Sequence, residues 1–220
     1  MLEIACFSRE AALIAKSAGA DRIEFCARYD LGGLTPAFDD VSFLHSDLHI
    51  PLFVMIRPRG GDFTYTDQEL RHMQQDIVHF KSVADGFVFG ILTPEKEIDG
   101  EKCKALVELA APKPCTFHRA IDETNNLEKS IESIAACGFK NVLTSGGKSS
   151  AIEGAETLKR LVIKGHENNL EVMPGGGVRS SNISQLRERT DATWFHSAAI
   201  LEGGLPSSDE IKTMLSSFLT

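Results

Sequence analysis

Short apolar runs alternate with helical segments along the whole chain. The runs are Leu2–Cys6, Arg22–Cys26, Leu52–Ile56, Gly86–Phe89, Cys115–His118, Asn141–Ser145, Leu170–Met173 and Trp194–Ser197. Between them, apolar residues recur at helical spacing, as in Leu70, Met73, Ile77 and Phe80. Strands that alternate with helices pair in parallel, and eight such units can close into a barrel. The pattern therefore predicts an α/β fold of the (β/α)8 TIM-barrel type.

Signals at the ends of the predicted helices support this reading. Thr66 and Glu69 form the sequence of a capping box, and Gly19 and Gly138 stand where a helix would turn into the next strand. The competing fold is an open doubly wound sheet. No G-x-G-x-x-G follows the first run, where Ser8 directly opens a helix. No linker interrupts the chain, so we predict one domain over residues 1–220.

Composition and charge narrow the possible partners. The chain has 220 residues, 42% of them hydrophobic, which suffices for one large core. Its net charge of -8 and the lack of Lys/Arg clusters argue against nucleic acid or an anionic membrane surface as partner. No apolar stretch reaches the roughly 18 residues of a membrane span, and the start has no leader pattern. Five scattered cysteines predict reduced thiols and a cytoplasmic protein.

Polar residues gather at the ends of the predicted strands. They include Glu24, Arg57, Arg59, Asp62, His118, Arg119, Ser145 and His196. In TIM barrels the C-terminal ends of the strands carry function, so we expect these side chains to meet at one mouth. Guanidinium forks suit carboxylate or phosphate, although an Arg-carboxylate brace inside the loop is an equal alternative. Glu24 and Arg57, on neighbouring strands, are expected to pair.

Three glycines follow the seventh run. Gly175, Gly176 and Gly177, with Ser180 and Ser181 after them, match the phosphate-binding loop of many barrels, although glycines also serve tight turns. Proton transfer would fall to Glu24 or His118. His118 could equally be a metal ligand or a structural histidine.

Several ordered stretches carry a family resemblance. They are Gly19–Cys26, Gly32–Pro36, Val54–Phe63, Thr116–Ala120, Val142–Gly147 and Met173–Val178. Through them the chain resembles the CutC family of copper homeostasis proteins, from Leu2 to about Ile200. The resemblance implies a cytoplasmic barrel that is often homo-oligomeric and is associated with copper handling. We expect a dimer, because C2 is the commonest closed symmetry. It implies no defined enzymatic reaction.

The resemblance also implies Cu(I) as a cofactor held by cysteines of the first two strands, since soft Cu(I) favours thiolates. The second-strand cysteine is Cys26. On the first strand the family's Glu-Val-Cys reads Glu3-Ile4-Ala5, and the thiol comes one place later at Cys6. Because strand side chains alternate, Ala5 should face the site and Cys6 the helices, unless the strand has ended by Cys6.

Two functions follow, and the sequence leaves open whether the protein is an enzyme. The first is copper homeostasis, with Cu(I) bound at Cys26. The alternative is an enzyme that acts on a small anionic or phosphorylated substrate at the C-terminal mouth, with Glu24 or His118 as catalytic candidates. Its predicted anion-binding set is Arg57, Arg59, Asp62, Arg119, Ser145, Gly175, Gly176, Gly177 and His196. A purely structural or interaction role has no dedicated signal in the sequence.

Overall fold

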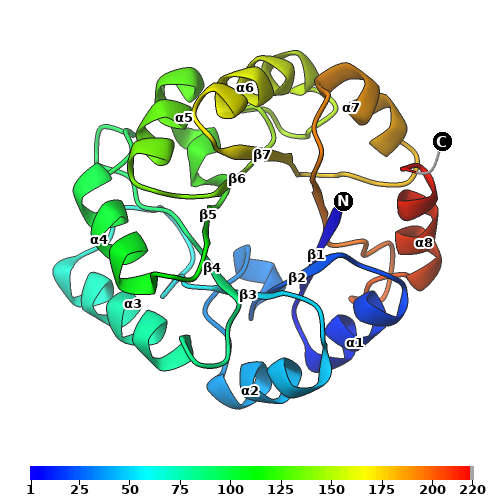
Figure 1. Cartoon of the computed structure of the whole chain (residues 1–220), viewed down its shortest axis with the longest axis horizontal. Helices are drawn as coiled ribbons and strands as arrows, with labels where there is room; N and C mark the ends of the chain where they lie inside the picture. The colour runs from blue at the N-terminus through cyan, green and yellow to red at the C-terminus, as the bar shows by residue number, and fades with distance from the viewer. Residues whose placement is uncertain (219–220) are drawn as a thin grey trace.

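The computed structural model describes residues 1–218, in which parallel strands and helices alternate around a barrel (Figure 1). The strands are β1 Leu2–Cys6, β2 Arg22–Phe25, β3 Leu52–Met55, β4 Gly86–Phe89, β5 Cys115–Phe117, β6 Asn141–Thr144, β7 Glu171–Pro174 and β8 Phe195–Ser197. The helices are α1 Arg9–Ser17, α2 Phe38–Asp47, α3 Asp67–Phe80, α4 Gly100–Ala110, α5 Leu127–Ala136, α6 Ala155–Glu167, α7 Ile183–Thr190 and α8 Ser208–Ser216, with short 3-10 turns η1 Tyr29–Leu31 and η2 Arg119–Glu123. The predicted TIM-barrel class is confirmed.

The strands form one parallel sheet in the order β7-β6-β5-β4-β3-β2-β1-β8. β1 pairs with β2 on one side and with β8 on the other, which brings the two ends of the chain's strand order together. Within residues 1–218 no hydrogen-bonded ladder joins β7 to β8, and β8 is only three residues long. The barrel is therefore nearly closed, with a seam between these strands.

Alternation along the strands divides the interior into two cores. On β1, Leu2, Ile4 and Cys6 pack in the large apolar layer between the sheet and the helices. Glu3 and Ala5, the residues between them, point the other way, into the lumen. A small apolar cluster of Cys26, Phe53, Met55 and Val88 fills part of that lumen, with Phe7 packed against it. Polar lumen residues contact this cluster directly, since the Arg22 guanidinium lies over the Phe53 ring and Cys26 Sγ lies 3.6 Å from Glu24 Oε2.

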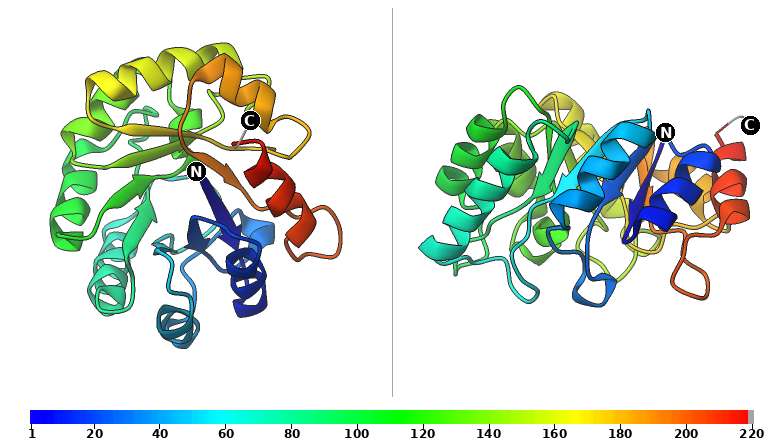
Figure 2. Two further views of the ribbon diagram at one scale, coloured as in Figure 1. Left: turned by 45° about the vertical axis from the view of Figure 1, so that its right-hand side comes forward. Right: turned by 90° about the horizontal axis from the view of Figure 1, so that it is seen from below.

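The ends of the elements obey the local rules. The Ser8 hydroxyl caps α1 by accepting the Ala11 N–H, and Thr66 and Glu69 form a complete capping box at α3. Gly19 and Gly138 take positive φ angles of 99° and 95°, as the turns after α1 and α5 require. In the side view of Figure 2, the loops after β2 and β8 project from the same end of the barrel. None of the helices within residues 1–218 has the length and apolar character to cross a membrane.

Candidate functional site

A cavity of about 290 Å³ opens among the residues that follow the strands. It is lined by Ala5, Phe7, Glu24, Cys26, Tyr29, Gly32, Met55, Arg57, Phe63, His118, Arg119, Leu143, Gly176, Gly177, Arg179, His196, Ser197 and Ala198. We call this space the mouth cavity. Most of the residues predicted to form a site lie together here, because each stands at or just beyond the C-terminal end of its strand.

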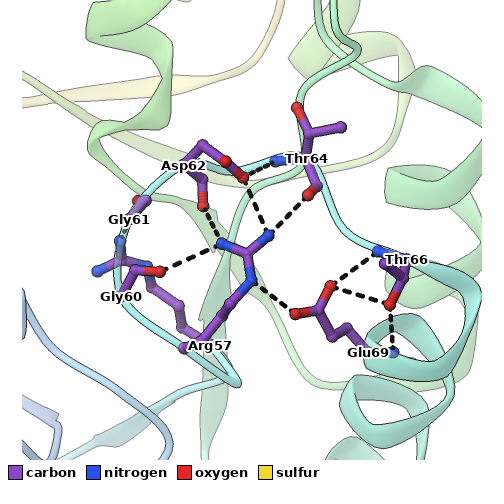
Figure 3. A network of polar contacts seen from close by, with 8 residues as sticks. Arg57, Gly60, Gly61, Asp62, Thr64, Thr66 and Glu69 are labelled. Atoms are coloured by element: carbon purple, nitrogen blue, oxygen red, sulfur yellow. Dashed lines mark hydrogen bonds and ion pairs between the residues drawn. The ribbon is translucent and has the colours of Figure 1, made fainter.

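Arg59 and Asp62 are exceptions, and they belong to a brace within the β3–α3 loop (Figure 3). Arg59 Nε donates to Glu69 Oε1 at 2.6 Å, and its Nη2 donates both to Asp62 Oδ1 at 3.0 Å and to the Thr64 carbonyl at 2.8 Å. Neither residue lines the mouth cavity. For Arg59, the brace is the correct reading, because the carboxylates of Asp62 in the loop and Glu69 in the first turn of α3 already satisfy the guanidinium.

Ser145 is also turned away from the mouth cavity. Its backbone N–H and its hydroxyl donate to the carboxylate of Asp122, a residue that sequence reasoning missed. The Asp122 carboxylate accepts hydrogen bonds from Thr144 Oγ1 at 2.5 Å, from the Ser145 and Gly147 backbones, and from Arg119 Nε at 2.9 Å. Arg119 also donates to Ser145 Oγ at 2.9 Å. Asp122 therefore fixes the β5 and β6 loops and leaves Arg119 at the rim of the cavity.

The glycine loop contributes only part of the predicted phosphate cradle. Gly176 and Gly177 line the cavity with positive φ angles of 92° and 76°. Gly175 lies behind them, where an added Cβ would be 2.4 Å from the Leu143 side chain. The backbone N–H and hydroxyl of Ser180 both bond to the Glu210 carboxylate at 2.7 Å. The position that sequence reasoning assigned to a phosphate near Ser180 is therefore filled by a carboxylate of α8.

Arg57 is buried, with 6% of its surface exposed, and it has no carboxylate partner. Its terminal nitrogens donate to the carbonyls of Leu31 at 2.9 Å and Gly61 at 2.8 Å, while its Nε has no partner. Its guanidinium lies over the Phe63 ring at 4.7 Å. The predicted Glu24–Arg57 ion pair is wrong, because loop carbonyls draw Arg57 away from the strand.

Arg179 is a second cavity residue without a carboxylate partner, and sequence reasoning missed it. Its guanidinium donates to Ser197 Oγ at 3.1 Å and to the carbonyls of Val178 and Ile200. The signal that could have revealed Arg179 is its place two residues beyond the glycine loop after β7. Three guanidinium cations thus border the cavity, and within residues 1–218 Arg119 pairs with Asp122 whereas Arg57 and Arg179 form no ion pair.

Glu3, Arg22 and His196 form what we call the lumen network, and of these three His196 also lines the mouth cavity. Arg22 Nε donates to Glu3 Oε2 at 2.5 Å, and His196 Nδ1 lies 2.7 Å from Glu3 Oε1. The Arg22 guanidinium is stacked between the rings of Phe53 at 4.2 Å and Trp194 at 4.3 Å. Although burial opposes the charged form, Arg22 and His196 hold the pKa of Glu3 below its usual value.

Glu24 stands between the lumen network and the mouth cavity. Its Oε2 lies 3.8 Å from His196 Nε2 and 3.6 Å from Cys26 Sγ, and its Oε1 is buried without a partner. Burial raises the pKa of Glu24 to about 7. For His196, burial alone would lower the pKa, but Glu24 and Glu3 together raise it. Glu24 can therefore both accept and release a proton near neutral pH.

The cysteines lie on opposite sides of the sheet. Cys26 lines the cavity beside Gly33. A Cβ added to Gly33 would lie 3.3 Å from Cys26 Sγ and 3.6 Å from the Met55 methyl carbon. Cys6 is buried in the outer core, with its Sγ 3.6 Å from the Ile4 carbonyl. Strand alternation thus places Ala5, and not Cys6, in the cavity, as predicted. Burial, reinforced by Glu24, raises the pKa of both thiols.

These positions do not fit a two-thiolate Cu(I) site. In the described part of the chain, the one set of His, Cys, Asp and Glu side chains with metal-ligand spacing is Glu3, Glu24 and His196. Their oxygen and nitrogen donors are harder than Cu(I) prefers, and both Glu3 oxygens are already engaged. Soft donors are limited to Cys26 and Met55.

One family model and two known proteins match most of the chain. Residues 1–201 match the model of the CutC family. The chain is 43% identical over 200 residues to the copper homeostasis protein cutC homolog of Homo sapiens, covering 90% of this chain and 73% of the human protein. It is also 43% identical over 199 residues to a CutC family protein of Xylella fastidiosa, covering 90% of this chain and 74% of that protein.

Solved structures give the same result. A CutC copper homeostasis protein of Streptococcus agalactiae superposes with a TM-score of 0.84 at 32% identity, covering 90% of this chain and 98% of that one. Deoxyribose phosphate aldolase from Aeropyrum pernix superposes with a TM-score of 0.68 at 15% identity, covering 99% of this chain and 90% of the aldolase. The second likeness shows a common fold alone.

Proposed function

The chain belongs to the CutC family, and we propose that its mouth cavity binds a small anionic or phosphorylated organic compound as the substrate of an enzyme. In this proposal Arg57 and Arg179 hold the anionic group, aided by Arg119 at the rim and the backbone of Gly176 and Gly177. Glu24 transfers a proton. The copper connection of the family would then concern the metabolism of the ligand or a separate binding event at Cys26.

The observation that carries this proposal is the unpaired charge of Arg57. A guanidinium with 6% exposure and no carboxylate partner costs several kcal/mol to bury. An anionic ligand in the cavity would offset that cost, and Arg179 would add a second donor from the other side. Guanidinium groups bind carboxylates and phosphates through paired hydrogen bonds. The cavity volume of about 290 Å³ suits a small metabolite.

The test is titration calorimetry of the whole chain with inorganic phosphate and with oxalate. We expect saturable binding of at least one anion, weakened about tenfold or more by Arg179→Ala, since this change removes a charged donor. The control is Arg9→Ala, because Arg9 pairs with Asp40 outside the cavity. Absence of saturable binding, or equal weakening in the control, would contradict the proposed function.

Cu(I) binding is the second candidate function, and it is favoured by the side chains of Cys26 and Met55, which belong to one buried cluster and both line the cavity. A thiolate and a thioether are both soft donors. Since Cys6 faces the helices, one thiolate would carry the site, and we expect weak binding. Cytoplasmic location and homodimer formation stay predictions. Light scattering at micromolar concentration tests the second, because a dimer has twice the 24.0 kDa mass of the chain.

A further inference from the structure

The His118 ring is fixed in one orientation at the end of β5. Its Nδ1 accepts the Ala120 N–H at 3.3 Å, where His118 caps the 3-10 turn η2. The ring packs against Phe63 with 4.8 Å between centroids. Gly90, directly after the neighbouring strand β4, leaves room for the ring, since a Cβ there would lie 2.8 Å from His118 Nδ1. The ring therefore cannot turn to exchange its two nitrogens without losing these contacts.

This orientation makes Nε2 a hydrogen-bond donor. Because Nδ1 accepts a backbone N–H, the proton of the neutral ring must sit on Nε2. Burial and the Arg57 charge lower the pKa of His118 to about 3, so the neutral form holds throughout the physiological range. His118 lines the mouth cavity, and its Nε2 is buried without a hydrogen-bond partner. A general-base role for His118 is thereby removed, since neither nitrogen is free to accept a proton.

The donor lies beside a cation. Phe63 contacts both the His118 ring, at 4.8 Å, and the Arg57 guanidinium, at 4.7 Å. The Arg57 Nε is also without a partner. An N–H and a guanidinium that share one wall favour an oxygen atom that carries, or gains, negative charge.

A proton acceptor stands across the cavity. Glu24 belongs to β2 and His118 follows β5, and β3 and β4 separate them in the sheet. The unpartnered Glu24 Oε1 is the third buried polar atom in the cavity residues that lacks a partner. A ligand between the two walls would thus meet a fixed N–H donor on one side and a carboxyl group on the other.

Resting on the anion-binding function proposed above, we propose that the substrate is a small anionic carbonyl compound and that the site removes a proton from the carbon next to its carbonyl. The Glu24 carboxylate takes that proton, and the C–H electron pair becomes a carbon–carbon double bond. The carbonyl π pair moves to the oxygen, which becomes an enolate oxyanion. His118 Nε2–H donates to this oxyanion and Arg57 balances its charge. Return of the proton from Glu24 completes the cycle without an oxidant or a second substrate.

The first experiment follows the exchange of C–H protons by NMR in deuterium oxide. The probes are pyruvate and dihydroxyacetone phosphate, both small anions with an acidic C–H beside a carbonyl. We expect catalysed exchange of at least one probe, reduced about 100-fold by Glu24→Gln and to a similar extent by His118→Ala. His118→Gln, which keeps a neutral N–H donor, should recover part of the rate. Arg9→Ala is the control and should exchange at the wild-type rate.

A second measurement uses the wild-type protein, so it does not depend on whether the variants fold. Nitrogen-15 NMR of the histidine rings should show His118 as the neutral Nε2–H tautomer from about pH 5 to 9, as its low pKa requires. A protonated ring or an Nδ1–H tautomer in that range would overturn the inference. So would a protein that binds phosphate yet exchanges neither probe, or exchange that survives His118→Ala. Loss of anion binding itself would instead contradict the proposed function, and the inference with it.

Discussion

The lumen network and the mouth cavity hold similar residues within one barrel, but their charges are treated differently. In the lumen network both Glu3 oxygens are bonded, one to Arg22 and one to His196. In the mouth cavity Arg57, His118 and Glu24 each keep one buried polar atom without a partner. Buried polar groups are normally satisfied, so unsatisfied ones need an explanation. The comparison teaches that completely paired charges and polar groups without partners lie next to each other in one barrel lumen.

The largest effect is expected in the lumen network. Glu3→Ala removes the anion beside Arg22, whose side chain is 6% exposed, and leaves a buried guanidinium without its counter-charge. We expect a loss of about 3–5 kcal/mol in the free energy of unfolding, measured by urea denaturation. The matched control is Glu156→Ala, because Glu156 pairs with Arg189 on the surface and is 75% exposed. That change should leave the free energy of unfolding nearly unchanged, because solvent screens this exposed pair. Equal costs would erase the distinction between the two regions.

Glu24→Gln should raise the free energy of unfolding, whereas Glu3→Ala should lower it. Burial raises the folded-state pKa of Glu24 from its usual value of 4.5 to about 7, so the folded protein holds this proton more tightly than the unfolded chain. The contribution of Glu24 to stability is therefore present below about pH 4.5 and is lost as pH rises through 7. The amide of Gln carries no charge to bury. At pH 8 the variant should be more stable than the wild type by on the order of 2 kcal/mol, and the difference should vanish near pH 4.5.

Urea denaturation of both proteins at several pH values measures this difference. A constant gap between them across the range would show that Glu24 titrates normally and is poorly suited to proton transfer. A gap that opens between pH 5 and 8 would support Glu24 as the acid–base group of the cavity.

The sequence predicted the barrel well because its strands follow a simple rule. Parallel strands covered by helices read as short apolar runs, and each predicted run overlaps a strand of the structure. β7 was placed one residue early, since Pro174 reads as a terminator although it forms the last position of the strand. The ladder between β7 and β8 could not be judged, because pairing depends on the twist and length of both strands.

The site was predicted less well, for reasons of side-chain geometry. Strand ends identified Glu24, Arg57, His118 and His196, whose backbone positions decide that they face the cavity. Glu3 and Arg22 were missed because they look like interruptions of apolar runs, and only the lumen shows that they pair. The partner of a long side chain depends on its rotamer and on nearby carbonyls. Sequence spacing therefore could not separate Arg57, which lacks a carboxylate, from Arg59, which has two.

Arg59 offers a smaller test of the same comparison. Its side chain is 35% exposed and bridges Glu69 and Asp62, so it resembles the lumen network in being fully paired. Arg59→Ala should cost about 1 kcal/mol or less in the free energy of unfolding, since solvent screens these pairs. The phosphate affinity of this variant should stay within about twofold of the wild-type value, in contrast to the roughly tenfold loss expected for Arg179→Ala. Calorimetry that showed a tenfold loss of phosphate affinity would move Arg59 from the brace to the binding site.

The weakest binding is expected at the two thiols, which lie on opposite sides of the sheet. Cys26 lines the cavity, whereas Cys6 packs in the outer core. If Cu(I) binds, one thiolate holds it, and affinity should be weak because burial and Glu24 raise the pKa of Cys26. In competition against a Cu(I)-specific chelator, Cys26→Ser should abolish binding and Cys6→Ser should leave it unchanged. Ala5→Cys should strengthen binding, since Ala5 lines the same cavity and a second thiolate would complete a soft site. Tight binding that is lost in Cys6→Ser would require the Cys6 thiol to leave the outer core and enter the lumen.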